Sequence, residues 1–304
     1  MPRSTQPGIY VETAIHSTMD TIWRLTQTPE LHQRWDLRFN TITYLPRADV
    51  AEPQRFLYET RIGFGLAICG TGESVGQVST TGGETTSSLK FGSDDRKSLI
   101  REGSGYWRYV PLSTGIRFLT WYDYQVRFGS FGRMLDRLAF RPLMGWATAW
   151  SFDRLRLWAE NDQSPEASMT LGLIHALARL TIAFVWIWHG LVPKLLFHHP
   201  EELATLREAH FSTHWLPWIG TAEIAMGILN LVTWNFRPIL LLDALCMVLL
   251  TLCVAIYSPE YLPAAFNPIT LNLSVLMLCV IGWLASGSMP IARRCLRRKP
   301  SGER

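Results

Sequence analysis

Hydrophobic and polar residues follow two different patterns along the chain. From the N-terminus to about residue 160, charged and apolar residues alternate over short distances. From about residue 175 to residue 290, long runs of Leu, Ile, Val, Ala and Trp follow one another. Short alternation is typical of a soluble domain, and long apolar runs are typical of membrane helices. The pattern therefore predicts a soluble domain followed by a membrane domain.

Four of the apolar runs are long enough to cross a bilayer, which takes about 20 residues of helix. They cover residues 176–197, 215–234, 238–257 and 268–287. Trp and Tyr residues stand near the ends of these runs, where the membrane interface favours amphipathic rings. Three clean runs of about 20 residues follow one another without an amphipathic period, so we predict transmembrane helices rather than buried helices of a large soluble core.

The charges beside these runs predict their orientation. Arg and Lys are frequent after the fourth run, and Arg237 follows the second, whereas the loop after the third run has neither residue type. Basic residues flank membrane helices mostly on the cytoplasmic side. The N-terminal residues also lack the apolar stretch of a signal peptide. We expect an integral protein of a bacterial-type inner or plasma membrane, with four spans and both termini in the cytoplasm.

The first 160 residues have the pattern of an α+β domain. Residues 8–15 alternate like a strand, and a helix is expected next, with Ser17 or Thr18 as its N-cap. A second short helix is expected to start at Thr28-Pro29. Five segments with strand character follow, separated by Gly and Asp turns, and helical spacing returns at residues 130–159. This order of elements is that of a helix-grip fold.

The segment "MDTIWRLTQTPELHQRWDLRF" resembles the helical opening of START-like proteins of the polyketide cyclase/dehydrase (SRPBCC) type. Trp23, Pro29-Glu30 and Trp35 match its pattern, and Thr28 stands where such sequences often have Asp. The resemblance implies an apolar ligand cavity between the sheet and the last helix. Strand alternation would place only every second aromatic residue on the inner face. The cavity candidates are Trp107, Tyr109, Phe118, Trp121, Tyr122 and Tyr124.

No catalytic constellation is evident in this half of the chain. The histidines have no nucleophile elbow near them, and the glycine-rich "GFGLAICGTG" lacks the helix that a phosphate-binding loop requires. Asp36, Glu59, Arg61 and Asp123 would be reactive only inside a cavity and are more simply explained as solvated groups. The net charge of +4 is not arranged like a nucleic-acid surface. We predict no catalytic residue and no nucleic-acid partner.

Metal binding also has weak support in the sequence. Six of the eight histidines lie between His175 and His214, and His210 and His214 have a four-residue spacing that can bind zinc on a helix. The five cysteines have no ligand spacing, and no haem, flavin or iron–sulfur motif is present. The histidines are more simply read as polar residues of an external loop. We predict no metal site and no evident cofactor.

Ionisable residues inside the predicted spans are candidates for function, because burying them in lipid is costly unless they are paired. By depth in the membrane, Lys194 could pair with Glu223, with His189 about one turn deeper than Lys194. Arg179 and Asp243 reach similar depths near the other side and could form a second pair. Both pairs would either hold the bundle together or, at His189, Lys194 and Glu223, bind a ligand.

The second half of the chain resembles the DoxX-like family of four-helix membrane proteins. The resemblance covers about residues 171–288 and rests on "WHGLVPKLLF", "HPEEL" and "GTAEIAMGILNL". It implies a membrane bundle, and some relatives of the wider group are associated with quinone-linked redox chemistry. A quinone is therefore a candidate cofactor or ligand. The positions that match the family pattern are Gly190, Pro193, Lys194, Glu223 and Gly227.

These observations predict a helix-grip, START-like cytoplasmic domain over residues 1–160 and a linker over 161–174. A DoxX-like all-α bundle of four transmembrane helices follows over 175–290, and a basic cytoplasmic tail covers 291–304. The expected function is to bind an apolar or amphipathic small molecule, a lipid, isoprenoid or quinone, at the cytoplasmic membrane face. Membrane lipids are the expected surroundings. Alternatives are a quinone-linked oxidoreductase subunit that needs a partner redox subunit, and a structural or assembly protein.

Overall fold

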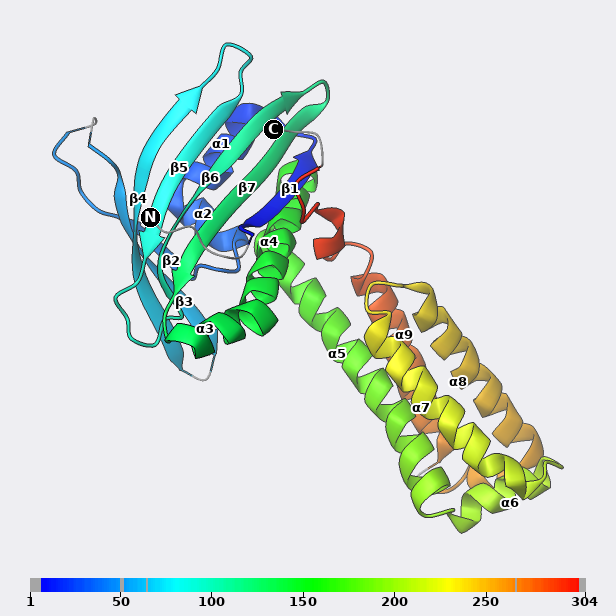
Figure 1. Cartoon of the computed structure of the whole chain (residues 1–304). Coiled ribbons are helices and arrows are strands. Elements are labelled where there is room, and N and C mark those ends of the chain that lie inside the picture. Colours follow the sequence, from blue (N-terminus) through cyan, green and yellow to red (C-terminus); the bar gives the residue numbers. More distant parts are fainter. Residues whose placement is uncertain (1–6, 50–51, 64, 266, 301–304) are drawn as a thin grey trace. The chain divides into compact units, whose positions relative to one another are not determined.

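A computed structural model describes residues 7–49, 52–63, 65–265 and 267–300. The chain forms two compact units (Figure 1). The first unit comprises Met1–Ser168 together with Pro290–Arg304, and the second comprises Met169–Met289. The helical second unit and the α+β first unit agree with the predicted fold class. The C-terminal residues, however, belong to the first unit, which the linear pattern did not indicate.

The first unit contains an antiparallel sheet with the strand order β1-β7-β6-β5-β4-β3-β2. Its strands are β1 (Ile9–Ile15), β2 (Thr41–Tyr44), β3 (Arg55–Gly63), β4 (Leu66–Ser79), β5 (Thr85–Gly92), β6 (Ile100–Leu112) and β7 (Gly115–Val126). Strand β4 was not predicted, because its Gly, Ser and Thr residues alternate only weakly with apolar ones. Residues 66–72 of the glycine-rich stretch form the first half of this strand.

The helices of the first unit begin where the sequence predicts. Thr18 caps α1 (Met19–Gln27) by accepting a hydrogen bond from the Thr21 amide, and Pro29 opens α2 (Pro29–Trp35). After β7 the chain forms α3 (Gly129–Leu135), the π-helical segment η1 (Asp136–Phe140) and α4 (Arg141–Asn161). A strand, two short helices, an antiparallel meander and a long last helix constitute the helix-grip arrangement.

The core of the first unit lies between the sheet and α4. Ala149, Phe152 and Leu155 form the buried face of α4, and the Phe152 ring stacks on Phe118 of β7 with 4.6 Å between centroids. Trp35 of α2 packs against Phe152 in the same core and donates its indole hydrogen to the Leu25 carbonyl. The interior is therefore aromatic and closely packed beside β7.

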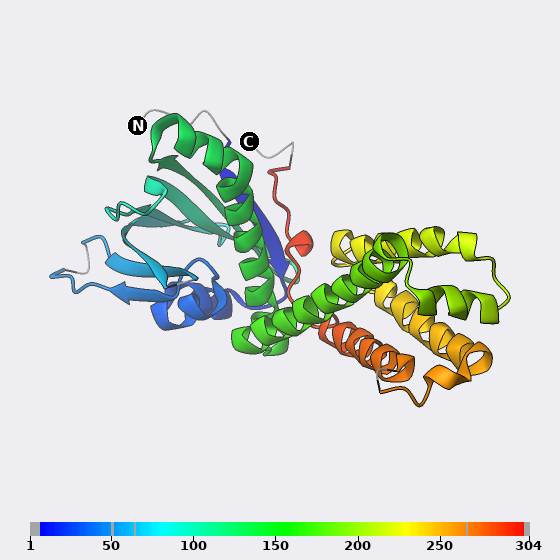
Figure 2. The same cartoon turned by 90° about the horizontal axis from the view of Figure 1, so that it is seen from below.

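The basic C-terminal tail, expected to stand alone, packs on this core. Glu12 of β1 and Leu296 exchange two backbone hydrogen bonds of 2.9 Å, so the tail lies along the edge of the sheet (Figure 2). The Ile291 amide donates to the Asp153 carboxylate of α4, and the Cys295 thiol donates to the Ala149 carbonyl. A short helical turn, η5 (Ala292–Arg294), lies between these contacts.

The second unit is a bundle of long helices (Figure 1). It contains most of α5 (Pro165–His189), and η2 (Gly190–Leu196), α6 (Pro200–Glu208), η3 (Thr213–Trp215), α7 (Leu216–Val232), α8 (Pro238–Tyr257), η4 (Pro259–Tyr261) and α9 (Pro268–Ala285). Among the described residues, four helical stretches have the length and apolar composition to cross a bilayer: Pro165–Leu196, Thr213–Val232, Pro238–Tyr257 and Pro268–Ala285. They correspond to the four predicted spans.

The first of these stretches begins earlier than predicted. Residues 161–174 were expected to be a linker, but α5 starts at Pro165, where proline fits the first helical turn and good helix formers follow. At its other end the helix widens into the π-helical η2, which contains Pro193 and ends soon after it. Proline removes a backbone donor and clashes with the preceding turn, which is consistent with the wider helix at this point.

Close contact between η2 and α7 depends on two glycines. A side-chain carbon added to Gly190 would lie 2.3 Å from the Gly220 carbonyl oxygen, and one added to Gly220 would lie 2.7 Å from that of Gly190. Small residues of this kind let membrane helices approach closely. The contact brings the polar residues of η2 beside those of α7.

Candidate functional site

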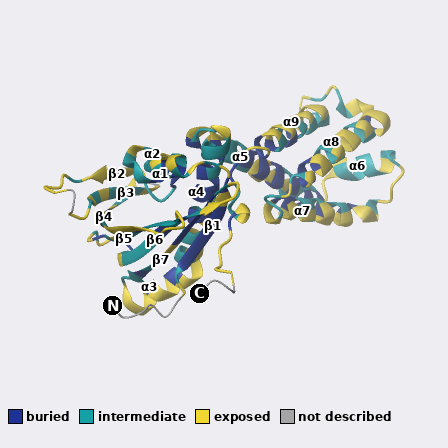
Figure 3. Ribbon diagram, turned by 90° about the horizontal axis from the view of Figure 1, so that it is seen from above, coloured by how far each residue is buried: buried dark blue, intermediate teal, exposed yellow. Residues whose placement is uncertain are grey.

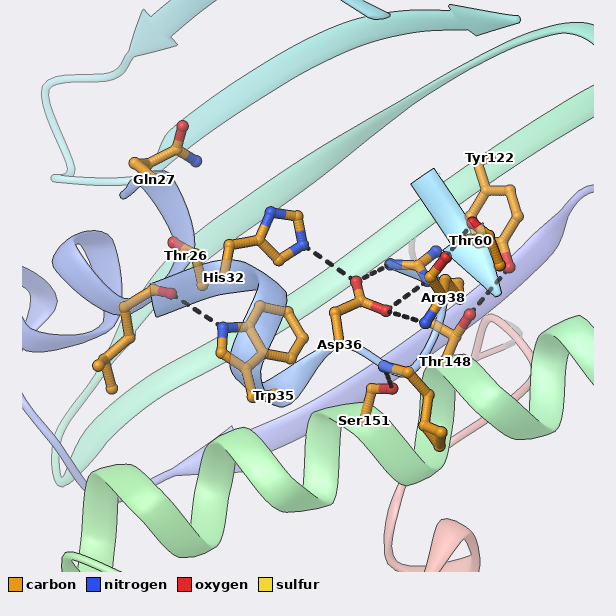
Figure 4. A network of polar contacts seen from close by, with 12 residues as sticks. Thr26, Gln27, His32, Trp35, Asp36, Arg38, Thr60, Tyr122, Thr148 and Ser151 are labelled. Atoms are coloured by element: carbon orange, nitrogen blue, oxygen red, sulfur yellow. Dashed lines mark hydrogen bonds and ion pairs between the residues drawn. The ribbon is translucent and has the colours of Figure 1, made fainter. Parts of the chain in front are cut away.

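A charged network lies inside the first unit, immediately after α2 (Figure 4). The Asp36 carboxylate is buried and accepts two side-chain hydrogen bonds from Arg38, from Nε at 2.8 Å and from Nη2 at 2.6 Å. His32 Nε2 lies 3.0 Å from the same carboxylate. The bidentate geometry makes this a strong, oriented ion pair. The sequence favoured a solvated Asp36, and this expectation was wrong because the carboxylate is buried and paired. Arg38 was not considered as its partner.

Both main layers of the domain hold this network in place. The Leu37 amide donates to Ser151 Oγ on α4 at 2.9 Å, and Thr60 of β3 donates its hydroxyl to the Arg38 carbonyl. The Arg38 guanidinium lies over the Tyr122 ring, 5.4 Å from its centroid. The Tyr122 hydroxyl is hydrogen-bonded in turn to Thr148 of α4. The network therefore ties the connection after α2 to the sheet and to the last helix.

The surroundings fix the ionisation of the network. Burial alone would raise the pKa of Asp36, but the Arg38 charge and the hydrogen bonds from Arg38 and His32 outweigh burial and hold this pKa well below its ordinary value. Burial lowers the pKa of His32 below its ordinary value of 6.5, although its hydrogen bond to Asp36 opposes the shift. Near neutral pH the network thus contains a carboxylate, a guanidinium and a neutral imidazole.

A pocket of about 470 Å³ lies over β3 to β6. Ligand pockets for small molecules typically measure about 300–1,000 Å³. Its wall combines aromatic, glycine and charged residues: Leu45, Arg55, Phe56, Thr71, Gly72, Glu73, Lys90, Phe91, Gly92, Glu102 and Gly103. The Phe91 ring contacts Tyr122 edge-on at 6.3 Å, and Tyr122 is the ring that faces Arg38. One aromatic layer therefore separates the pocket wall from the buried guanidinium.

The cavity candidates from the sequence occupy other positions. Five of them, Trp107, Tyr109, Phe118, Tyr122 and Tyr124, are buried and belong to the core between sheet and helices. Trp121 is 37% exposed and stacks on Tyr106 instead, so its assignment to the cavity was wrong. It alternates with Tyr122 along β7 and therefore faces the other side of the sheet. None of the six lines the pocket over β3 to β6.

A second polar site lies at one end of the helical bundle. Lys194 of η2 is 7% exposed, and its ammonium lies 3.1 Å from Glu223 Oε2 on α7 and 3.1 Å from Glu202 Oε1 on α6. The structure thus brings the predicted Lys194 and Glu223 together. The second carboxylate, Glu202, was not predicted, because its segment looked like a solvated loop. The third predicted member, His189, contacts Lys194 through its backbone carbonyl at 3.5 Å.

A third polar group lies deeper in the bundle and corrects a predicted ion pair. Arg179 Nη1 donates to Asn230 Oδ1 at 3.2 Å, and the Asn230 side-chain amide donates to Asp243 Oδ1 at 3.1 Å. The Trp186 indole donates to the same aspartate oxygen at 2.8 Å. Arg179 and Asp243 do not pair directly in the described residues; Asn230 bridges them. The prediction used only the depth of each residue in the membrane. Depth placed Arg179 and Asp243 at the same level but could not show that Asn230 lies between them.

The histidines do not gather into a metal site in the described ranges. His175 lies between the Gly282 and Trp234 carbonyl oxygens, at 3.2 and 3.1 Å. His210 and His214 do not share a helix, because His210 follows the end of α6 and His214 lies in η3. No group of three or more His, Cys, Asp or Glu side chains with metal-binding geometry occurs among the residues that the structure describes.

Comparison with known proteins places the second unit in a family. Residues 183–280 match the model of the DoxX-like family. The chain is also 50% identical over 186 residues to the uncharacterized membrane protein YndG of Bacillus subtilis. The matched region is 61% of this chain and 69% of that protein.

Solved structures also resemble part of this chain. The Zhui aromatase/cyclase from Streptomyces sp. R1128 is 10% identical, with a TM-score of 0.38, over 52% of this chain and 98% of its own. A STAR-related lipid transfer protein from Xanthomonas axonopodis is 12% identical, with a TM-score of 0.36, over 51% of this chain and 94% of its own. These likenesses concern the fold of the N-terminal half.

Proposed function

We propose that this chain, which belongs to the DoxX-like family of membrane proteins, binds an amphipathic small molecule in its START-like domain and works at the membrane that anchors it. A lipid, an isoprenoid or a quinone has the required character, an apolar body with a polar end. The membrane unit keeps the binding domain where such molecules dissolve. No catalytic step is part of this proposal.

The observation that carries the proposal is the pocket over β3 to β6, placed one aromatic layer from the Asp36–Arg38 pair. Phe56 and Phe91 offer apolar contact in its wall, and Arg55, Lys90, Glu73 and Glu102 offer polar contact at the same pocket. A few polar groups in an otherwise apolar site fix the orientation of a ligand. An amphipathic molecule satisfies both parts of this lining.

The helical bundle offers a second candidate site for the polar end of an amphipathic ligand. Lys194 is shared by two carboxylates, so the charges of Lys194, Glu202 and Glu223 sum to minus one when all three are ionised. Ionisable groups within membrane helices commonly mark ligand or proton sites. We propose that this cluster binds the polar part of a membrane-dissolved ligand.

We also propose that both ends of the chain lie on the cytoplasmic side. The tail after α9 packs on the same unit as the N-terminal domain, which supports an even number of crossings. The basic residues of this tail support the cytoplasmic side. Labelling of single cysteines from either face of intact cells would test the orientation.

The direct test is native mass spectrometry of the full-length protein, extracted gently from membranes, with lipid analysis of co-purifying molecules. Thr71 is an exposed pocket residue on β4, so Thr71→Trp should fill the pocket and reduce ligand retention. Ser79→Trp, exposed on the same strand outside the pocket, is the matched control. Retention unaffected by Thr71→Trp but lost in Lys194→Met would place the ligand in the bundle and refute the pocket.

A second candidate function is a quinone-linked oxidoreductase subunit, and the Lys194 cluster favours it because quinone reduction consumes protons. Such a subunit would receive electrons from a partner redox subunit. A co-purifying quinone that becomes reduced only when that partner is present would support it. If no molecule co-purifies with the protein and Lys194 and Glu223 variants change only stability, a structural or assembly role is favoured over both.

A further inference from the structure

The chain between β7 and the first part of α4 carries many exposed apolar side chains. Phe131 and Leu138, for example, are 63% and 72% exposed. Figure 3 shows α3 in the colour of exposed residues. Large exposed apolar patches mark interaction surfaces more often than chance. We call this set the apolar ridge: Phe128, Phe131, Met134, Leu135, Leu138, Leu143 and Trp146.

The opposite side of the same segment fixes the ridge in its outward position. A side-chain carbon on Gly132 would lie 1.8 Å from the Arg127 carbonyl oxygen, so only glycine lets α3 approach the end of β7 this closely. Asp136 accepts a hydrogen bond of 2.7 Å from the Tyr124 hydroxyl, and Phe140 packs edge-on against the Tyr124 ring. The segment is thus held by its inner face, and the apolar side chains have no place in the core.

A four-residue repeat normally drifts by about 40° per step around an α-helix with 3.6 residues per turn. Gly132, Asp136 and Phe140 follow such a repeat, yet all three face inward. The wider turn of η1 lies between the last two and offsets the drift. The π-helical segment therefore keeps both the inner contacts and the ridge aligned.

Charge on this segment is divided between the two faces. Its one acidic residue from 128 to 146, Asp136, points inward and pairs with Arg141, which also pairs with Asp123. Arg133 and Arg137 remain exposed beside the ridge, and neither forms an ion pair within the described part of the chain. The outward face is accordingly apolar and positively charged, with no acidic group.

We propose that the apolar ridge is a membrane-docking surface, and that its partner is the anionic face of the bilayer in which this chain is anchored. Apolar side chains flanked by basic ones insert into the boundary between headgroups and acyl chains. A second copy of the chain fits this face less well, because a two-fold contact would bring like charges together. The four membrane helices tether the domain and give a weak surface a high effective concentration.

The conformation at the start of α3 agrees with this role. Phe128 has a φ of 66°, a left-handed conformation that bulky residues rarely adopt, and Gly129 follows with a φ of 54°. This turn leaves the Phe128 ring 55% exposed at the end of the ridge. Left-handed conformations of bulky residues cost free energy and are found mostly at functional sites, where they fix the direction of a side chain.

The test uses the full-length protein in vesicles and a fluorescent label at single cysteines. Cys69, Cys246 and Cys253, the cysteines that are not buried, are first replaced by alanine. An environment-sensitive dye is then attached to Leu138→Cys on the ridge or to Val78→Cys on β4. Val78 is the matched control because it is an equally exposed apolar residue, at 67%. Lipids with a spin label near the headgroup quench a dye that reaches the interface.

In vesicles with anionic phosphatidylglycerol, we expect quenching and a blue-shifted emission at position 138 and neither at position 78. Arg133→Glu with Arg137→Glu should lower the ratio of docked to undocked protein by at least about tenfold. Each basic group near an anionic surface strengthens docking several-fold, and the substitution removes two of them. Arg133→Lys with Arg137→Lys should leave it unchanged. Both positions are exposed, so folding is unaffected.

Three results would overturn the proposal. The dye at position 138 could remain in water in anionic vesicles. It could be quenched equally in purely zwitterionic vesicles and in the Glu variant, which would remove the anionic surface from the mechanism. It could instead be shielded only as protein density in the membrane rises, without lipid quenching, which would identify a second copy as the partner.

Discussion

Buried carboxylates are satisfied differently in the two units. In the first unit, Asp36, Asp136 and Asp153 each have hydrogen bonds to both oxygens, mostly from arginines. In the second unit, Asp243 receives hydrogen bonds only at Oδ1, and no described residue donates one to its buried Oδ2. Lys194 is likewise a single cation for two carboxylates.

The two units therefore use buried charges for different purposes: the first holds its helices in place, and the second can still bind a proton or a ligand group. A fully paired buried charge fixes one geometry and offers nothing to a further ligand. A carboxylate with a spare acceptor, or two carboxylates around one ammonium, can still take up a proton or a donor group. The first unit therefore uses its charges to position α2 and α4, and the second unit keeps polar capacity inside the bundle.

The largest expected effect tests this contrast with two like substitutions. Asp36→Asn turns an amide toward Arg38 and His32, and breaking such a buried pair costs about 3–5 kcal/mol. Asp243→Asn keeps the Oδ1 acceptor and places the new amide at the Oδ2 position, to which no described residue donates. We therefore expect a loss of only about 1–2 kcal/mol of stability, from the missing negative charge beside Arg179. Hydrogen exchange of α2 and α8 in the full-length protein measures both. Equal losses of protection would contradict the comparison.

Deleting residues 290–304 should have the next largest effect. Asp153 would lose the Ile291 amide and the Arg294 guanidinium, and β1 would lose its two hydrogen bonds to Leu296. At about 0.5–1 kcal/mol per hydrogen bond, losing these four bonds should cost the first unit roughly 2–4 kcal/mol of stability. Arg297→Ala with Arg298→Ala, which leaves these bonds in place, serves as the control. Unchanged exchange at β1 after the deletion would show that the tail does not brace the sheet.

Lys194→Met should affect ligand retention more than stability. The substitution keeps the length of the apolar stem of this buried lysine. It leaves Glu202 and Glu223 without their cation, and because both carboxylates are partly exposed we expect a stability cost of about 1–2 kcal/mol. Lys194→Arg preserves the charge and should restore retention of the co-purifying molecule. If Met and Arg variants retain the molecule equally well, the cluster is not its polar contact.

The smallest expected effect is a pH dependence from His32. The folded state keeps this imidazole neutral because burial lowers its pKa below 6.5, whereas the unfolded chain takes up a proton near that value. The unfolded state thus binds more protons, and the stability contributed by His32 is lost as pH falls below 6.5. Asp36, with its depressed pKa, adds a further loss only below about pH 4.

His32→Gln removes the titration and keeps a side chain that can donate to Asp36. Denaturation of the full-length protein between pH 7 and pH 5 should therefore show a flatter pH dependence in this variant than in the parent chain. The histidines of the bundle are common to both proteins, so the difference between the two curves belongs to His32. Identical slopes would show that His32 is not held neutral.

Local pattern was sufficient for much of the fold. The sequence predicted the proline start of α2 and the four membrane stretches, and it limited the cap of α1 to Ser17 or Thr18, of which Thr18 is the cap. Each of these features depends on residues within one element. The strand β4 was missed because its glycines and hydroxyl residues weaken the alternation that marks a strand.

The sequence by itself predicted the four spans and most helices and strands of the first unit, because these depend on periodicity within one element. Only the tertiary structure decided which polar residues meet: Leu37 with Ser151, Glu202 with Lys194, and Asn230 between Arg179 and Asp243. It also decided that the last residues join the first strand at Glu12 and Leu296. Such contacts depend on the direction of each side chain around its element and on the packing of distant segments, and neither is encoded in a local pattern.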